Sequence, residues 1–134
     1  MRGLRGYARA RMDSASSEDV LVMLLEGAVD RCRQADAAMD EGDRSLWNKH
    51  LHTVRAIFME LQMALDADGD PQLILHLRNT YAWIILHATE AAKHGDRVRL
   101  AEVRRVVEMM YGTWAQAVAI ARGDAEAPGV GEEG

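Results

Sequence analysis

Residues Ser14–Val29 read SASSEDVLVMLLEGAV, a pattern typical of the N-terminal part of a helix. Ser16 can serve as the N-cap, because its hydroxyl can accept a hydrogen bond from a free backbone amide of the first turn. Glu18 and Asp19 add negative charge at the positive end of the helix dipole. The apolar residues that follow recur at steps of three and four, which is the helical period. We therefore expect a helix over about residues 17–41.

Three more segments carry the same period, and strong turn signals separate them. Gly42-Asp43-Arg44 and Gly95-Asp96-Arg97 each combine a glycine for a left-handed helix end with an aspartate for the next N-cap. Pro71 suits the first turn of a helix. We expect these helices over about 44–66, 71–94 and 98–122. The apolar stripes expected to form the core are Leu21, Leu24, Ala28, Cys32, Ala35 and Met39; Trp47, Leu51, Val54, Phe58, Leu61 and Leu65; Ile74, Leu77, Tyr81, Ile84, Ile85, Ala88 and Ala92; and Val103, Val106, Val107, Met110, Trp114, Ala117 and Ala121.

Four helices of similar length with short connections predict one all-α domain, an antiparallel up-down-up-down four-helix bundle. We place the bundle at residues 14–122. We expect residues 1–13 to form a flexible N-terminal arm and residues 123–134, ending in APGVGEEG, to form a disordered tail.

Composition excludes several classes of protein. The net charge of −5 argues against a dedicated nucleic-acid binder. Cys32 is the only cysteine, so neither a disulfide framework nor a paired-thiol site can form within the chain. No apolar run is long enough to span a membrane, and the N-terminus lacks the core of a secretory signal. We expect a cytoplasmic protein, monomeric or weakly dimeric, without stable membrane insertion.

The order of several short motifs resembles a known family. Residues 14–20 are similar to a TASPEEL motif and residues 23–29 to MLYDGAI. Further matches follow at Ile57, Glu60, Leu61, Leu65 and Asp66, at Leu77 and Tyr81, and at Trp114. Together they resemble the flagellar secretion chaperone (FliS) family from about Tyr7 to Val118. The chain departs from the family pattern at Ser17 in place of proline, at Leu25-Glu26 in place of Tyr-Asp, and at Trp83 in place of tyrosine.

The resemblance implies a cytoplasmic export chaperone with neither enzymatic activity nor a cofactor. Its client would be the C-terminal helical segment of flagellin, which it would keep from premature filament assembly. An alternative is a helical adaptor for another secretion or regulatory client. Either function requires apolar side chains outside the core stripes, where a client helix could lie.

Such side chains occur on three of the expected helices. Met59 and Met63 lie opposite the core stripe of their helix, and methionine suits adaptable contacts. Scattered surface apolar residues are normal, but aligned ones indicate an interaction site. The full set of candidate flagellin-binding residues is Tyr7, Met59, Met63, Leu75, Ala82, Trp83, Leu86, Met109, Ala115 and Ile120.

Tyr7 lies among four arginines of the N-terminal arm. The resemblance implies that this tyrosine belongs to a segment that folds over the apolar surface and yields to flagellin. The alternative is that the arm is a disordered basic tail in which the tyrosine has no particular role.

A metal site is the remaining alternative. His87, Glu90 and His94 share one helix face, and imidazoles with a carboxylate can ligate a metal. Bundle metalloproteins, however, collect inward-facing ligands from several helices. We therefore expect a solvated face here, without a bound metal, and keep a metal-dependent bundle enzyme only as a remote hypothesis.

Overall fold

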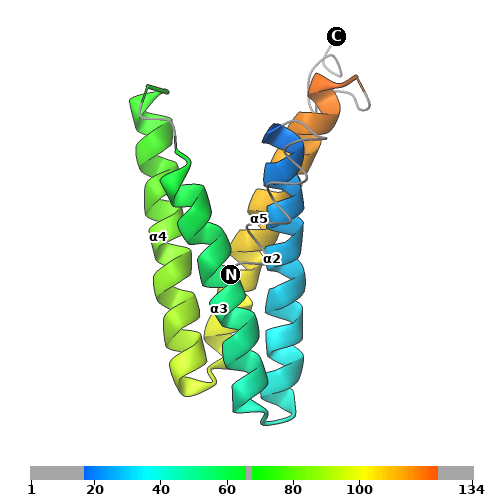
Figure 1. The fold of residues 1–134 in the computed structure, drawn as a ribbon, viewed down its shortest axis with the longest axis vertical. Coiled ribbons are helices and arrows are strands. Elements are labelled where there is room, and N and C mark those ends of the chain that lie inside the picture. The colour runs from blue at the N-terminus through cyan, green and yellow to red at the C-terminus, as the bar shows by residue number, and fades with distance from the viewer. Residues whose placement is uncertain (1–16, 66–67, 124–134) are drawn as a thin grey trace.

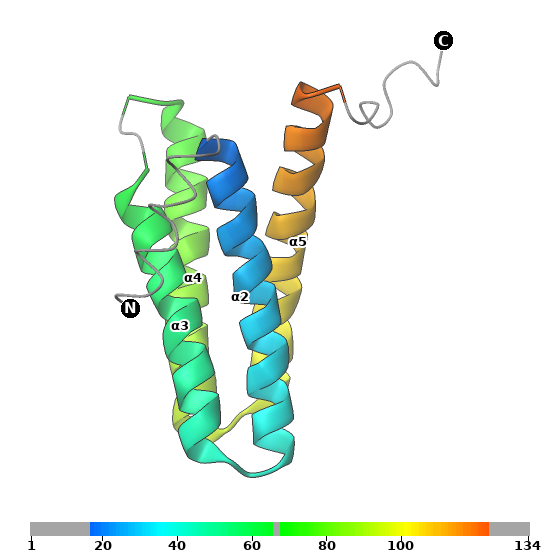
Figure 2. The same ribbon diagram turned by 45° about the vertical axis from the view of Figure 1, so that its right-hand side comes forward.

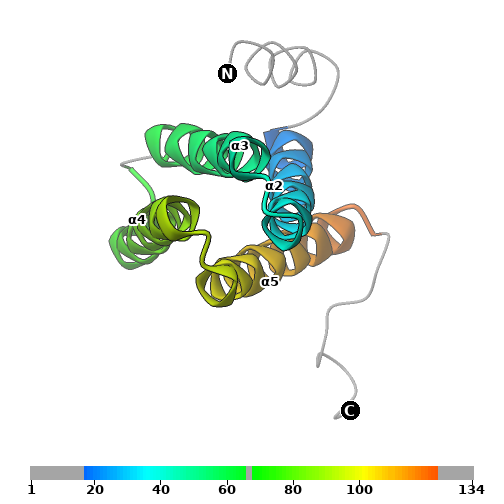
Figure 3. The same ribbon diagram turned by 90° about the horizontal axis from the view of Figure 1, so that it is seen from below.

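The structure, a computed structural model, describes residues 17–65 and 68–123 and consists there of four α-helices. They are α2 (Ser17–Asp40), α3 (Arg44–Met63), α4 (Pro71–His94) and α5 (Arg97–Ala121). Seen along the bundle, the helices form a ring in which α2 contacts α3 and α5, and α4 contacts the same two (Figure 3). Neighbours run antiparallel (Figure 2), which confirms the predicted up-down-up-down bundle. The expected N-cap Ser16, the arm and the tail beyond Gly123 lie outside the described residues.

The two Gly-Asp joints adopt the predicted conformation. Gly42 and Gly95 have φ of 72° and 62°, in the left-handed region that favours glycine. The next residues cap the following helices: Asp43 Oδ1 accepts from the Leu46 amide at 3.1 Å, and Asp96 Oδ1 accepts from the Arg99 amide at 3.0 Å. Both turns lie at the same end of the bundle, which we call the turn end (Figure 1).

One predicted boundary is wrong. The second helix ends at Met63, not at Asp66, and Ala64 is its C-cap. The Ala64 amide donates to Leu61 at 3.2 Å and the Leu65 amide to Gln62 at 3.4 Å. These short-range bonds tighten the last turn and end the helix before the turn-forming residues 68–71, Asp-Gly-Asp-Pro.

The buried residues of α4 and α5 lie mostly towards the turn end, whereas those of α2 and α3 extend farther along the bundle, to Val20 and Leu61. In α5 the buried residues are Leu100, Val103 and Val107, all in the first half of that helix. In α4 the buried residues begin at Tyr81. Towards the other end, the α3–α4 pair leans away from the α2–α5 pair (Figure 1). Several residues there that pack on the core, such as Leu21, Leu77 and Trp114, are only partly buried.

The expected core stripes were too narrow in all four helices, and the stripe of α5 was also too long. Each helix packs against two neighbours, so its apolar face is wider than one stripe. The additional buried residues are Val20, Leu25, Val29, Ala38, Ile57, Ala91 and Leu100. Ala117 and Ala121, expected in the core, are exposed because α4 has diverged from α5 at their level.

Candidate partner-binding surface

Large apolar side chains are exposed on the outside of α3 and α4. Met59 and Met63 are 53% and 76% exposed on α3, and Leu75 and Leu86 are each 58% exposed on α4. Met59 and Met63 are four residues apart, as are Ala82 and Leu86, so each pair lies on one helix face. Ala82 is also exposed. These five candidates therefore remain available to a partner.

Two contacts between α3 and α4 place the five residues together. The Gln62 Nε2 amide donates to the Arg78 carbonyl at 3.4 Å, and the Phe58 and Tyr81 rings lie 5.7 Å apart. Met59 and Met63 directly follow Phe58 and Gln62, so they project from the outer side of this contact. Ala82 follows Tyr81 in the same way. We call the surface formed by Met59, Met63, Leu75, Ala82 and Leu86 the outer seam.

Trp83 belongs to a different surface. Its ring is partly buried, packs against the core and stacks on His87 at 4.2 Å between ring centroids. His87 Nδ1 in turn lies 2.6 Å from Arg99 Nη1 of α5. Trp83 therefore lines the side of α4 that faces α5, away from the outer seam.

The candidates on α5 do not join the outer seam either. Ala115 and Ile120 are partly buried, while Met109 is 62% exposed. Ala115 lies one turn after Tyr111, whose hydroxyl donates to Glu26 of α2 at 3.3 Å. This places Ala115 on the α2 side of α5, so the α5 residues do not form one continuous surface with α3–α4. Tyr7 lies outside the described residues.

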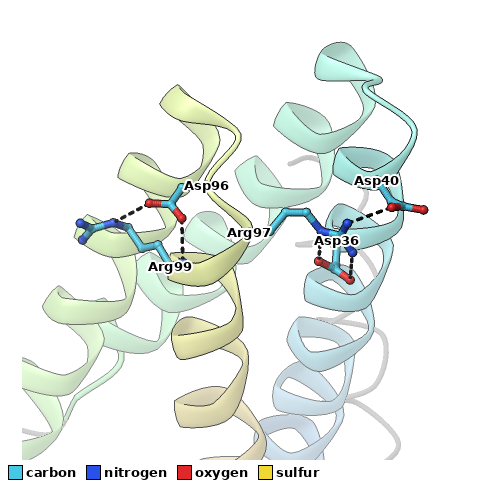
Figure 4. A network of polar contacts seen from close by, with 5 residues as sticks. All are labelled: Asp36, Asp40, Asp96, Arg97 and Arg99. Atoms are coloured by element: carbon cyan, nitrogen blue, oxygen red, sulfur yellow. Dashed lines mark hydrogen bonds and ion pairs between the residues drawn. The ribbon is translucent and has the colours of Figure 1, made fainter.

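The α2–α5 face is polar. Arg97 donates from Nε to Asp36 and from Nη1 to Asp40, both at 2.9 Å (Figure 4). This fork of hydrogen bonds holds the pKa of the Asp36 carboxyl below its usual range. Arg33 pairs with Glu108 at 3.3 Å, and Arg122 pairs with Asp19. Ion pairs thus join α2 and α5 along their length.

A pocket of about 400 Å³ opens on the same polar face. Its lining is mixed in charge, and the Glu26 carboxylate raises the pKa of the Tyr111 phenol. No motif in the sequence indicated this pocket. The lining residues are Glu26, Val29, Asp30, Arg33, Glu108 and Tyr111.

His50 is a buried polar residue that belongs to no sequence motif. The residue is 7% exposed, and its Nδ1 lies 3.1 Å from Arg31 Nη1 of α2. Burial, reinforced by the positive charge of Arg31, lowers the pKa of His50. Its spacing from Trp47 and Val54, three and four residues, was the available signal that it faces the core.

The histidine face of α4 is occupied by local contacts. His94 Nε2 lies 3.9 Å from Glu90 Oε1, and His87 interacts with Arg99 as described above. Within residues 17–65 and 68–123, no three His, Cys, Asp or Glu side chains are placed to hold a metal ion. Cys32 is buried, and burial raises the pKa of its thiol to about 12, so it remains protonated at neutral pH.

Across the described part of the chain, no helix combines the length and the apolar character needed to cross a lipid bilayer.

Comparison with known proteins shows which family the sequence matches. The model of the family described as flagellar protein FliS matches residues 2–121. A flagellar secretion chaperone FliS of Vibrio cholerae serotype O1 is 26% identical over 121 residues, which cover 87% of this chain and 89% of the relative. The match therefore includes all four helices described above.

Proposed function

Because the chain belongs to the flagellar protein FliS family, we propose that it is an export chaperone of flagellar protein secretion. Its client, in this proposal, is the C-terminal helical segment of flagellin. Holding that segment in the cytoplasm keeps flagellin from assembling before export. The protein acts by binding one partner and carries out no chemical step.

The observation that carries the proposal is the outer seam. Four of its five side chains are large, apolar and more than half exposed. An apolar surface that stays uncovered on a folded domain is typical of an interaction site. A row of apolar side chains at helical spacing suits the apolar face of an amphipathic helix, and methionines adapt to its side chains. A flagellin helix laid along α3 and α4 would bury this surface.

The alternative is an adaptor that presents the outer seam to a different secretion or regulatory client. Both functions use the same surface, so the identity of the helix that binds it separates them. The C-terminal flagellin segment is the direct probe.

We expect Met59→Glu combined with Leu86→Glu to abolish flagellin binding, because each change places a charge where the client helix packs. Binding of the C-terminal flagellin segment, measured by calorimetry, should weaken about a hundredfold or more. Both side chains are exposed, so the helical content measured by circular dichroism should not change.

Val98→Glu is the matched control, since Val98 is 76% exposed on α5 at the turn end, away from the outer seam. Unchanged affinity in the double variant would show that the client lies elsewhere on the bundle. If the wild-type protein does not bind the flagellin segment, the result would favour the adaptor function.

A further inference from the structure

Basic side chains alternate with the apolar residues of the outer seam. Arg78 lies three residues after Leu75 and four before Ala82, and Arg55 lies four before Met59, so both share the face of the seam. The Gln62–Arg78 contact sets the register of the two helices. From the end opposite the turns, the order along the seam is Met63 and Leu75, Arg78, Met59 and Ala82, Arg55, and then Leu86.

These two arginines differ from those of the α2–α5 face. There Arg33, Arg97 and Arg122 each pair with a carboxylate of the other helix. Within the described part of the chain, the guanidinium groups of Arg55 and Arg78 form no ion pair. Lys93, farther along the α4 side, is also exposed. In a chain of net charge −5, the exposed apolar row is therefore accompanied by two arginines that no described carboxylate pairs with.

We propose that the outer seam recognises an amphipathic helix whose apolar stripe is flanked by aspartate or glutamate side chains. This inference rests on the proposed function and specifies the chemistry of the client segment. The apolar stripe packs on the methionines and leucines, while the flanking carboxylates pair with Arg55 and Arg78. Charges at the edge of an apolar contact steer the encounter and set the register of the helix more than they add affinity.

An anionic membrane surface is the other partner that basic and apolar residues can attract. The chain as a whole is acidic, and the outer face of α2 adds Glu18, Glu26 and Asp30. A membrane would meet repulsion from this net charge at low salt, whereas a single helix along the seam lies against Arg55 and Arg78 and meets Glu90 only beyond Leu86. The charge distribution therefore favours a helical protein segment.

The test uses two synthetic peptides of about 20 residues, long enough to cover the seam at ~1.5 Å per residue. They share one apolar stripe, and its flanks are glutamate in one peptide and lysine in the other. We expect the full-length protein to bind the glutamate peptide about tenfold more tightly at low salt. The preference should shrink in about 0.5 M salt, where exposed charges are screened.

The variant Arg55→Gln with Arg78→Gln should lose most of this preference and leave binding of the lysine peptide no weaker. The control Lys49→Gln with Arg105→Gln removes the same charge from exposed positions outside the seam and should keep the preference. Equal affinity for the two peptides, or a preference that survives the seam variant, would overturn the inference. So would arginine-dependent binding to phosphatidylserine vesicles in place of either peptide.

Flagellin separates the two proposals. If the C-terminal flagellin segment still binds the Arg55→Gln, Arg78→Gln variant at full affinity but not the Met59→Glu, Leu86→Glu variant, the function stands and the charge inference fails. If the glutamate peptide binds through the arginines but flagellin does not bind, the inference stands and the client is a different protein.

Discussion

The contact between Trp47 and Gly95 ties the two turns of the bundle together. Trp47 Nε1–H donates to the Ala92 carbonyl at 2.9 Å, so the start of α3 is bound to the end of α4. Arg44 lies over the same ring, 5.1 Å from its centre, and donates to the Lys93 carbonyl at 3.3 Å. A β-carbon added at Gly95 would lie 2.9 Å from the indole ring. Gly95 is thus required both for its φ and for its lack of a side chain.

Gly95→Ala should therefore destabilise the bundle more than Gly42→Ala. Both glycines have positive φ, which costs an alanine about 1–2 kcal/mol. Only at Gly95 would the new β-carbon meet another side chain, and its overpacking against Trp47 adds roughly 1–3 kcal/mol. Urea unfolding followed by circular dichroism measures the loss of unfolding free energy in each variant. Equal losses of unfolding free energy would mean that the indole moves aside without cost.

At the scale of helices, local signals set the boundaries. Aspartates 43, 70 and 96 each cap the helix that follows them, and Pro71 begins α4. The end of α3 is the exception, because no glycine stands there and the last turn tightens before the sequence signal. Where a cap or a left-handed glycine was present, the sequence located the helix end to within a residue.

Removal of a cap should have a measurable effect on stability. Asp43→Ala and Asp96→Ala each lose an acceptor for an amide of the first turn and should cost about 1 kcal/mol of unfolding free energy. Glu102→Ala, at an exposed position inside α5, is the control and should change stability by less than about 0.5 kcal/mol. If the control and the cap variants unfold at the same urea concentration, these capping bonds contribute no net stability.

At the scale of the whole molecule, the burial of α4 and α5 changes along the bundle axis. The buried part of α5 ends at Val107, and the α3–α4 pair separates from the α2–α5 pair beyond that level (Figure 1). The α2–α5 pair is held there by Tyr111–Glu26 and Arg122–Asp19. Surface ion pairs contribute little stability compared with apolar burial. The end opposite the turns should therefore open more readily than the turn end.

Native-state hydrogen exchange should reveal this gradient within α5. The amides of residues 109–114 should exchange faster than those of residues 103–107, although the first group lies at least seven residues from the end of the helix. Fraying from the helix ends alone would not produce this difference. Equal protection across the two groups would show that α5 opens as one unit with the core.

The amino-acid sequence was sufficient for the number of helices, most of their ends, the bundle topology and the family. These properties depend on caps, turn residues and periodicity, all of which act between residues close in the chain. The exposure of Met59, Met63 and Leu86 could also be anticipated from the helical period. Tertiary structure was needed to show that Leu25 is fully buried, that Ala117 is exposed, and that Trp83 stacks on His87. It was also needed to show that Arg78 and Met63 lie on the same surface. Burial and surface composition depend on where neighbouring helices touch and where they separate, and residues far apart in the chain set those distances.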